Sequence, residues 1–73
     1  MSGSQLSHLI AMINQIAANN AWRDDSEEAA ASVATHVRKF WARPMKEQLL
    51  GYLEEGGSGL SELSRQALDK LRQ

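Results

Sequence analysis

Apolar residues recur at steps of three and four along most of this chain, which is the spacing of one face of an α-helix. Three breaks interrupt the pattern: a polar link at residues 23–26, a proline at position 44 and a glycine-rich turn at residues 56–59. No alternation of apolar and polar residues indicates a strand. The sequence therefore predicts an all-α fold, a small single-domain bundle of four short helices. We expect residues 5–73 to form the helical domain and residues 1–4 to be disordered.

The expected ends of these helices coincide with residues that cap or break helices. The two asparagines at positions 19–20 should end the first helix, and one of the three residues 24–26 should cap the second. The third helix should run from Pro44 to about Glu55, because proline suits a first turn but disfavours helical geometry in the residue before it. The turn at residues 56–59 then leads to Ser61, a good N-cap for the fourth helix.

Helix packing alone must hold the chain together. A domain of 73 residues buries only about 60% of the surface that its unfolded chain exposes. There is no cysteine, which excludes disulfides and thiolate metal sites and fits a reducing compartment. The apolar stripe of the second helix ends at Trp41, and Phe40 beside it should widen the stripe. Over the four helices, the residues expected to be most buried are Ile13, Val33, Val37, Leu49 and Leu53.

Basic charge is concentrated in one segment, residues 36–46, on a chain whose formal net charge is −1. The near-neutral total argues against a nucleic-acid binder, although cations beside aromatics also suit single-stranded nucleic acid. Arg and Trp are enriched at protein interfaces. The segment therefore predicts a contact surface, while the alternative is that its aromatics fill the core and its cations are merely solvated. The residues assigned to this surface are Arg38, Lys39, Trp41, Arg43 and, more distantly, Trp22.

No residue pattern indicates catalysis or cofactor binding. His8 and His36 are not at metal-ligand spacing, and no serine lies in a Gly-x-Ser-x-Gly turn. The glycine turn lacks the Lys-Ser/Thr pair of a phosphate-binding loop. We therefore expect no catalytic, cofactor-binding or metal-binding residue in this chain. No apolar run is long enough to span a membrane and no signal peptide is apparent, so we expect a cytoplasmic protein without membrane contact.

Three blocks of the sequence resemble a known family in their order and spacing. They are residues 12–17 (MINQIA), residues 33–41 (VATHVRKFW) followed by Met45, and residues 56–61 (GGSGLS) with the closing helix after them. Together they resemble the delta subunit of cytoplasmic NAD-dependent formate dehydrogenase. Two features depart from the family: the proline lies one step later, at position 44, and Trp22 stands in part for an aromatic pair near the end of the first helix.

The resemblance implies a non-catalytic accessory subunit that supports the assembly or stability of a multisubunit enzyme. Its partners would be the larger formate dehydrogenase subunits, foremost the catalytic one, and these would carry the molybdenum or tungsten pterin, the iron–sulfur clusters and the FMN. Asn14 and Gln15, within the first block, either hydrogen-bond a partner backbone or are solvated. The alternatives are a transient assembly chaperone for the molybdoenzyme and a small helical nucleic-acid-binding regulator.

Overall fold

The computed structural model describes residues 2–72, with side chains described from Gln5 onward, and it contains four helices. They are α1 (Ser2–Asn20), α2 (Ser26–Phe40), α3 (Arg43–Glu54) and α4 (Glu62–Arg72). No strand occurs among residues 2–72. The predicted all-α class is confirmed. α1 begins at Ser2, and Met1 lies outside the described residues. The disorder expected for residues 1–4 stays a prediction.

Local chemistry explains where three of the helices begin or end. Asp25 caps α2, and its side chain accepts a hydrogen bond from the Glu27 amide at 2.9 Å. Pro44 lies in the first turn of α3, where its missing N–H costs nothing. The Ser61 hydroxyl accepts from the Ser64 amide at 3.2 Å and so caps α4. These are the capping and breaking residues that the sequence predicts.

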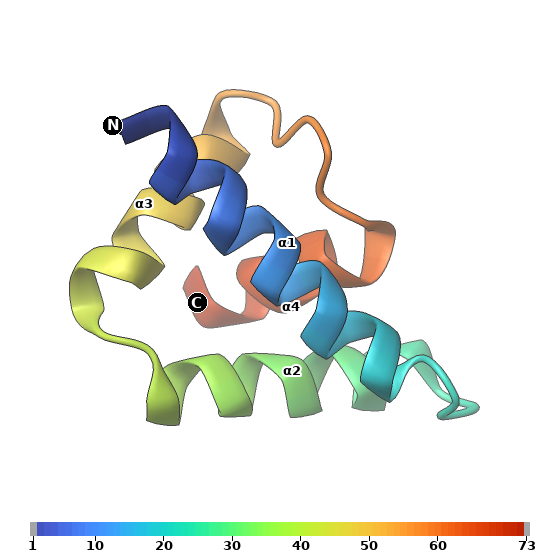
Figure 1. Cartoon of the computed structure of the whole chain (residues 1–73). Helices are drawn as coiled ribbons and strands as arrows, with labels where there is room; N and C mark the ends of the chain where they lie inside the picture. Colours follow the sequence, from blue (N-terminus) through green and yellow to red (C-terminus); the bar gives the residue numbers. More distant parts are fainter. Residues whose placement is uncertain (1, 73) are drawn as a thin grey trace.

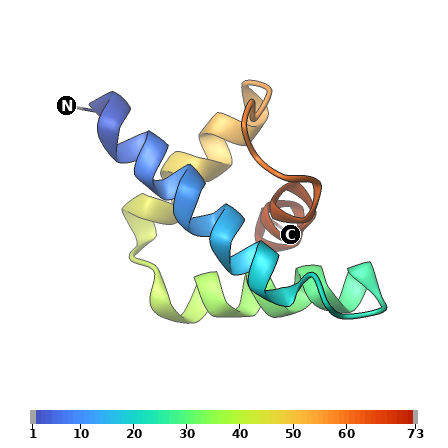
Figure 2. The same ribbon diagram turned by 45° about the vertical axis from the view of Figure 1, so that its right-hand side comes forward.

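The four helices enclose one core. α1 and α2 diverge from the turn at residues 21–25 (Figures 1 and 2). α3 follows the far end of α2 and packs against α1, and α4 contacts all three other helices. The most extensive contact is between α2 and α4. α2 buries small side chains, Ala29, Ala30 and Ala34, alongside its two valines, and small side chains let packed helices approach closely. The fully buried large side chains are Leu9, Ile13, Val33, Val37, Leu49 and Leu68.

Four of the five core predictions are confirmed, and the prediction for Leu53 is wrong. Ile13, Val33, Val37 and Leu49 are at most 1% exposed, whereas Leu53 is only half-buried. Leu53 lies in the last turn of α3, where it packs against the edge of the core and beside the glycine turn. A Cβ placed on Gly57 would lie 3.2 Å from its Cδ1.

The turn between α3 and α4 depends on glycine at position 57. Gly57 has φ +63° and is buried, and an added Cβ would also lie 3.2 Å from the side chain of Leu60. The Arg65 guanidinium donates to the Gly57 carbonyl at 2.8 Å. The positive φ therefore disfavours a larger residue here, and the neighbouring side chains would have to shift to make room for one.

Candidate interaction surface

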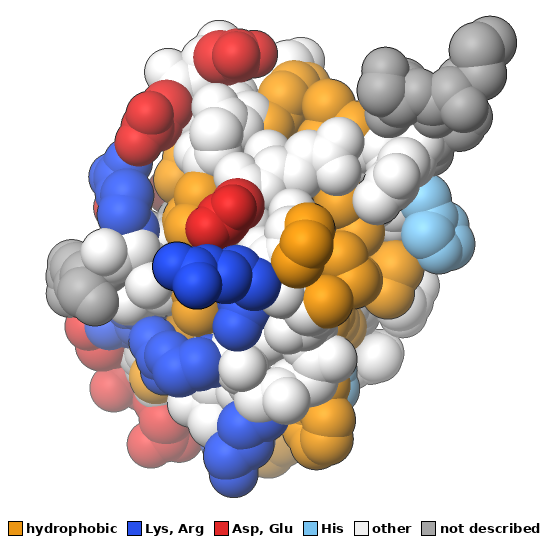
Figure 3. All heavy atoms as spheres, turned by 90° about the vertical axis from the view of Figure 1, so that its left-hand side faces the viewer, with side chains coloured by type: hydrophobic (Ala, Val, Ile, Leu, Met, Phe, Trp, Pro, Cys, Tyr) orange, Lys and Arg blue, Asp and Glu red, His pale blue; other side chains and the backbone are white. Residues whose placement is uncertain are grey.

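The corner between α2 and α3 carries positive charge that nearby acids only partly neutralise. Arg43 pairs with Glu47 at 3.1 Å, and both side chains are exposed. Arg38 and Lys39 are exposed and form no ion pair among the described residues. Lys46 donates to the carbonyl of Arg38 at 3.3 Å. Figure 3 looks at this side of the molecule, where Lys and Arg side chains gather in the lower half beside hydrophobic ones.

A shallow hollow runs along the outer side of α2, and we call its surroundings the α2 face. It is lined by Arg23, Glu28, Ala31, Ser32, Thr35, His36, Lys39 and Phe40. Phe40 lines one end of the hollow, and Trp22, in the turn before α2, lies against Arg23 at the other end. Phe40 is 72% exposed and Trp22 is 73% exposed, and these are the exposed large hydrophobic residues of the described part of the chain. Such side chains add nothing to the core and are available to another surface.

The aromatic at each end of the α2 face rests on a polar neighbour. The ring of Phe40 is tilted against that of His36, with the centroids 5.0 Å apart. The ring of Trp22 lies 4.7 Å from the guanidinium carbon of Arg23, a cation–π arrangement. Each exposed ring therefore has one contact within the chain.

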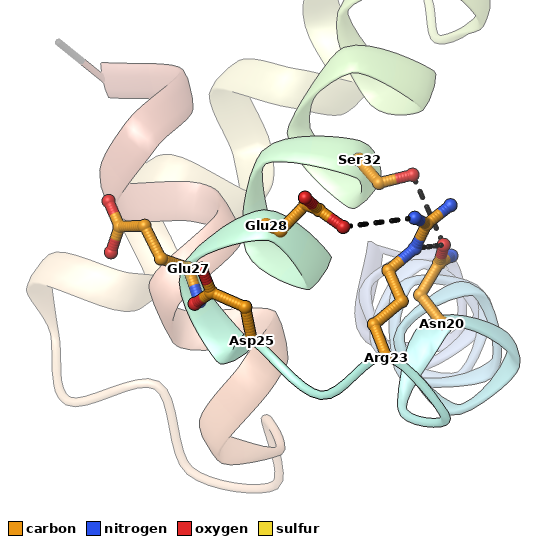
Figure 4. Close-up of polar contacts among 6 residues, drawn as sticks. All are labelled: Asn20, Arg23, Asp25, Glu27, Glu28 and Ser32. Atoms are coloured by element: carbon orange, nitrogen blue, oxygen red, sulfur yellow. Dashed lines mark hydrogen bonds and ion pairs between the residues drawn. The ribbon is translucent and has the colours of Figure 1, made fainter.

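A hydrogen-bond network fixes the position of Arg23 at the edge of this face (Figure 4). Its Nε donates to the Asn20 side-chain oxygen at 3.3 Å, and its Nη1 lies 3.5 Å from the carboxylate of Glu28. The Ser32 hydroxyl donates to the same Asn20 oxygen at 3.1 Å. The end of α1, the following turn and the first half of α2 are thus joined around one guanidinium.

A family model matches residues 8–68 of the chain, a range that includes the whole α2 face and most of all four helices. The family is described as the NADH-dependent formate dehydrogenase delta subunit FdsD. The chain belongs to this family. The resemblance seen in the sequence is confirmed, and membership implies association with other formate dehydrogenase subunits. Neither a curated protein nor a solved structure gives a significant match.

The structure of this delta-family chain separates the predicted contact residues into two groups. Trp22, Arg38, Lys39 and Arg43 are exposed, as is Gln15, whose amide donates to Asn19 at 3.3 Å. Partner contact through these residues stays a prediction. Trp41 and Asn14, described next, belong to the fold.

Trp41 and Phe40 have opposite surroundings although they are neighbours in sequence. Trp41 is 6% exposed and belongs to the core, whereas Phe40 does not widen the apolar stripe as expected. α2 ends at Phe40, and Trp41 has extended backbone angles, φ −92° and ψ 140°. This change of direction turns the indole inward and leaves the phenyl ring outside. The aromatic available to a partner is therefore Phe40, which was not among the predicted contact residues.

The side chain of Asn14 connects α1 to the start of α4. Its amide nitrogen donates to the Gly59 carbonyl at 2.8 Å. Its oxygen accepts from the Ser61 amide at 3.0 Å and from the hydroxyl of Ser64, which is fully buried, at 2.7 Å. The internal hydrogen bonds occupy both ends of this amide, so Asn14 stabilises the fold.

The described residues show no constellation suited to metal binding or membrane insertion. No group of three or more His, Asp or Glu side chains among residues 2–72 is placed to hold a metal ion. In the same part of the chain, every helix is too short or too polar to cross a bilayer.

Proposed function

We propose that this chain is a non-catalytic accessory subunit of an NAD-dependent formate dehydrogenase. In this proposal it binds a larger subunit, the catalytic one, and supports assembly or stability of the complex. The observation that carries the proposal is the exposure of Phe40 at the end of α2 and of Trp22 in the turn before it, together with Arg38 and Lys39, which have no ion pair among the described residues. Aromatic anchors with charged residues around them are typical of protein interfaces.

The dimensions of the α2 face suit such a role. The 15 residues of α2 span about 22 Å at the rise of an α-helix. An aromatic side chain buries about 150–250 Å² when it is covered, and a stable interface takes about 800 Å² from each partner. Two aromatics with the side chains between them account for a large part of such an area. The cations beside them favour an acidic partner surface and a fast encounter with it.

The redox cofactors belong, in this proposal, to the partner subunits. Iron–sulfur clusters are held mainly by cysteine thiolates, and this chain has no cysteine. The larger subunits would carry the molybdenum or tungsten pterin, the iron–sulfur clusters and FMN, as the family resemblance implies. In this proposal the complex is cytoplasmic, as the family resemblance implies.

The accessory role can be tested by preparing the formate dehydrogenase complex with and without this chain. The isolated chain should neither oxidise formate nor bind a flavin, pterin or iron–sulfur cluster. The complex without it should keep its turnover per bound cofactor but assemble in lower yield or lose activity faster on heating. Native mass spectrometry should find the chain in a fixed ratio to the other subunits. A cofactor-loaded isolated chain would contradict the proposal, and absence from the mature complex would indicate a transient chaperone.

The charge of the α2–α3 corner can be tested by a double reversal, Arg38→Glu with Lys39→Glu. Incorporation into the complex should slow by about tenfold or more, because like charges oppose the encounter. The free protein should stay folded, since exposed ion pairs and charges contribute little to stability. The rate can be followed by adding the labelled chain to the complex that lacks it. The exchange Arg38→Lys with Lys39→Arg keeps the charge and serves as the control, and an unchanged rate for the reversal would remove the corner from the interface.

A further inference from the structure

A second hollow lies between the C-terminal half of α1, the turn that follows it and the first turns of α4. Two adjoining depressions form it and share Ala21, Glu62 and Leu63. We call it the α1–α4 groove and define it by Ala18, Ala21, Asp24, Glu62 and Leu63. It is lined by small side chains, one leucine and two exposed carboxylates.

Each part of the groove has room for one large side chain. The two parts have volumes of about 270 and 200 Å³. The part between α1 and α4 offers almost only apolar surface. The hydrophobic effect would therefore favour filling it with a large apolar side chain.

The two carboxylates at the edge of the groove are not neutralised within the described chain. Among the acids, Glu27, Glu28, Glu47, Glu54 and Asp69 each pair with a cation. Asp24 and Glu62 have no ion pair among the described residues. Arg23, the one cation that lines the groove, pairs with Glu28.

Uncompensated charges of opposite sign therefore lie at opposite ends of α2. The cations Arg38 and Lys39 are at its C-terminal end, and Asp24 with Glu62 are near its N-terminal end. A partner surface that carries one sign of charge can therefore complement only one of the two ends of α2. An acidic surface suits the first end and a basic segment suits the second.

We propose that the α1–α4 groove binds a segment of another formate dehydrogenase subunit that presents a large apolar side chain next to a Lys or Arg. The apolar side chain enters the groove and the cation pairs with Glu62 or Asp24. The inference rests on the proposed function and extends it. The chain then holds two partner surfaces of opposite charge together, one at the α2 face and the other at this groove.

The test measures binding of the chain to the purified complex that lacks it, with two matched pairs of variants. Ala18→Phe fills the groove, and Ala11→Phe places the same ring on an exposed position of α1 outside it. Glu62→Lys reverses a groove charge, and Glu55→Lys reverses an acid outside the groove that also has no ion pair among the described residues. We expect Ala18→Phe and Glu62→Lys to raise Kd by about tenfold or more, and the two controls by less than about twofold.

Cross-linking identifies the occupant directly. A photo-reactive phenylalanine analogue at position 18 should capture a segment containing a large apolar residue beside Lys or Arg, and the same analogue at position 11 should capture none. Circular dichroism checks that each variant is folded. If Ala18→Phe does not fold, Glu62→Lys and the cross-link test whether the groove binds the segment. Wild-type chain that does not bind the complex would overturn the proposed function itself. Wild-type binding with groove variants equal to their controls would overturn the groove alone.

Discussion

Replacing Trp41 with alanine should lower the free energy of unfolding by about 3–5 kcal/mol, the usual cost of removing a large buried aromatic side chain. Trp41 is 6% exposed and belongs to the core cluster at the corner where α2 ends and α3 begins. A small domain has a total stability near the lower end of about 5–15 kcal/mol. The variant should therefore be largely unfolded at moderate temperature, which urea and thermal melts followed by circular dichroism would show.

The adjacent residue provides the control. Phe40→Ala removes a ring that is 72% exposed, so the free energy of unfolding should change by no more than about 0.5 kcal/mol. Binding to the formate dehydrogenase complex should weaken instead, because Phe40 borders the α2 face. If Phe40→Ala destabilises the free protein as much as Trp41→Ala does, Phe40 belongs to the core and is not available to a partner.

The second large effect is expected at Asn14. Asn14→Ala removes three hydrogen bonds, each contributing about 0.5–1.5 kcal/mol, and leaves the buried hydroxyl of Ser64 without the acceptor that it now uses. Alanine regains some helix propensity. The free energy of unfolding should therefore fall by about 2–3 kcal/mol. Amide hydrogen exchange at Ser61 should also become faster, because its N–H loses its partner.

Gln15→Ala is the control for Asn14, since the two amides are neighbours on α1. Gln15 is exposed, and its side chain donates a hydrogen bond to that of Asn19 on the surface. Its removal should change the free energy of unfolding by no more than about 0.5 kcal/mol. Equal melts for the two variants, with both impaired in binding the complex, would return Asn14 to the partner surface that the sequence first suggests.

The helix boundaries could be predicted because each depends on a few adjacent residues. Asp25 reaches the amide of Glu27, two positions on, and Ser61 reaches that of Ser64, three positions on. Pro44 restricts its own backbone and that of the residue before it. Local interactions of this kind are visible in the order of the residues alone.

The parts that could not be predicted depend on residues distant in the chain. Asn14 bonds to groups 45 to 50 positions away, and nothing near it in the sequence indicates which. Trp41 continues the apolar stripe and Phe40 lies beside it, but the order of the residues leaves open whether each ring fills the core or meets a partner. Leu53 continues the spacing of α3, but its helix ends over the glycine turn.

Only the local features of the candidate surface could be predicted from the sequence. The concentration of cations in residues 36–46 is evident in the sequence, and so is the family resemblance. The relation between Trp22 and Phe40 is not, because they border one face only once α2 has formed and Arg23 has docked against Asn20. The α1–α4 groove is formed by residues from both halves of the chain and leaves no continuous pattern.

The dependence of α2 on α4 also bears on how the protein is made. The main packing partner of α2 follows it by more than twenty residues, so the ribosome finishes α2 when only α1 is available to pack against Val33 and Val37. At about 5–20 residues per second, the interval between the synthesis of Trp41 and that of Leu68 is roughly 1–5 s. During this time neither the α1–α4 groove nor the Asn14 hydrogen bonds can exist. Recognition by the enzyme should therefore follow translation of the delta chain through α4, and a nascent chain still lacking that helix would offer its partners an incomplete binding surface.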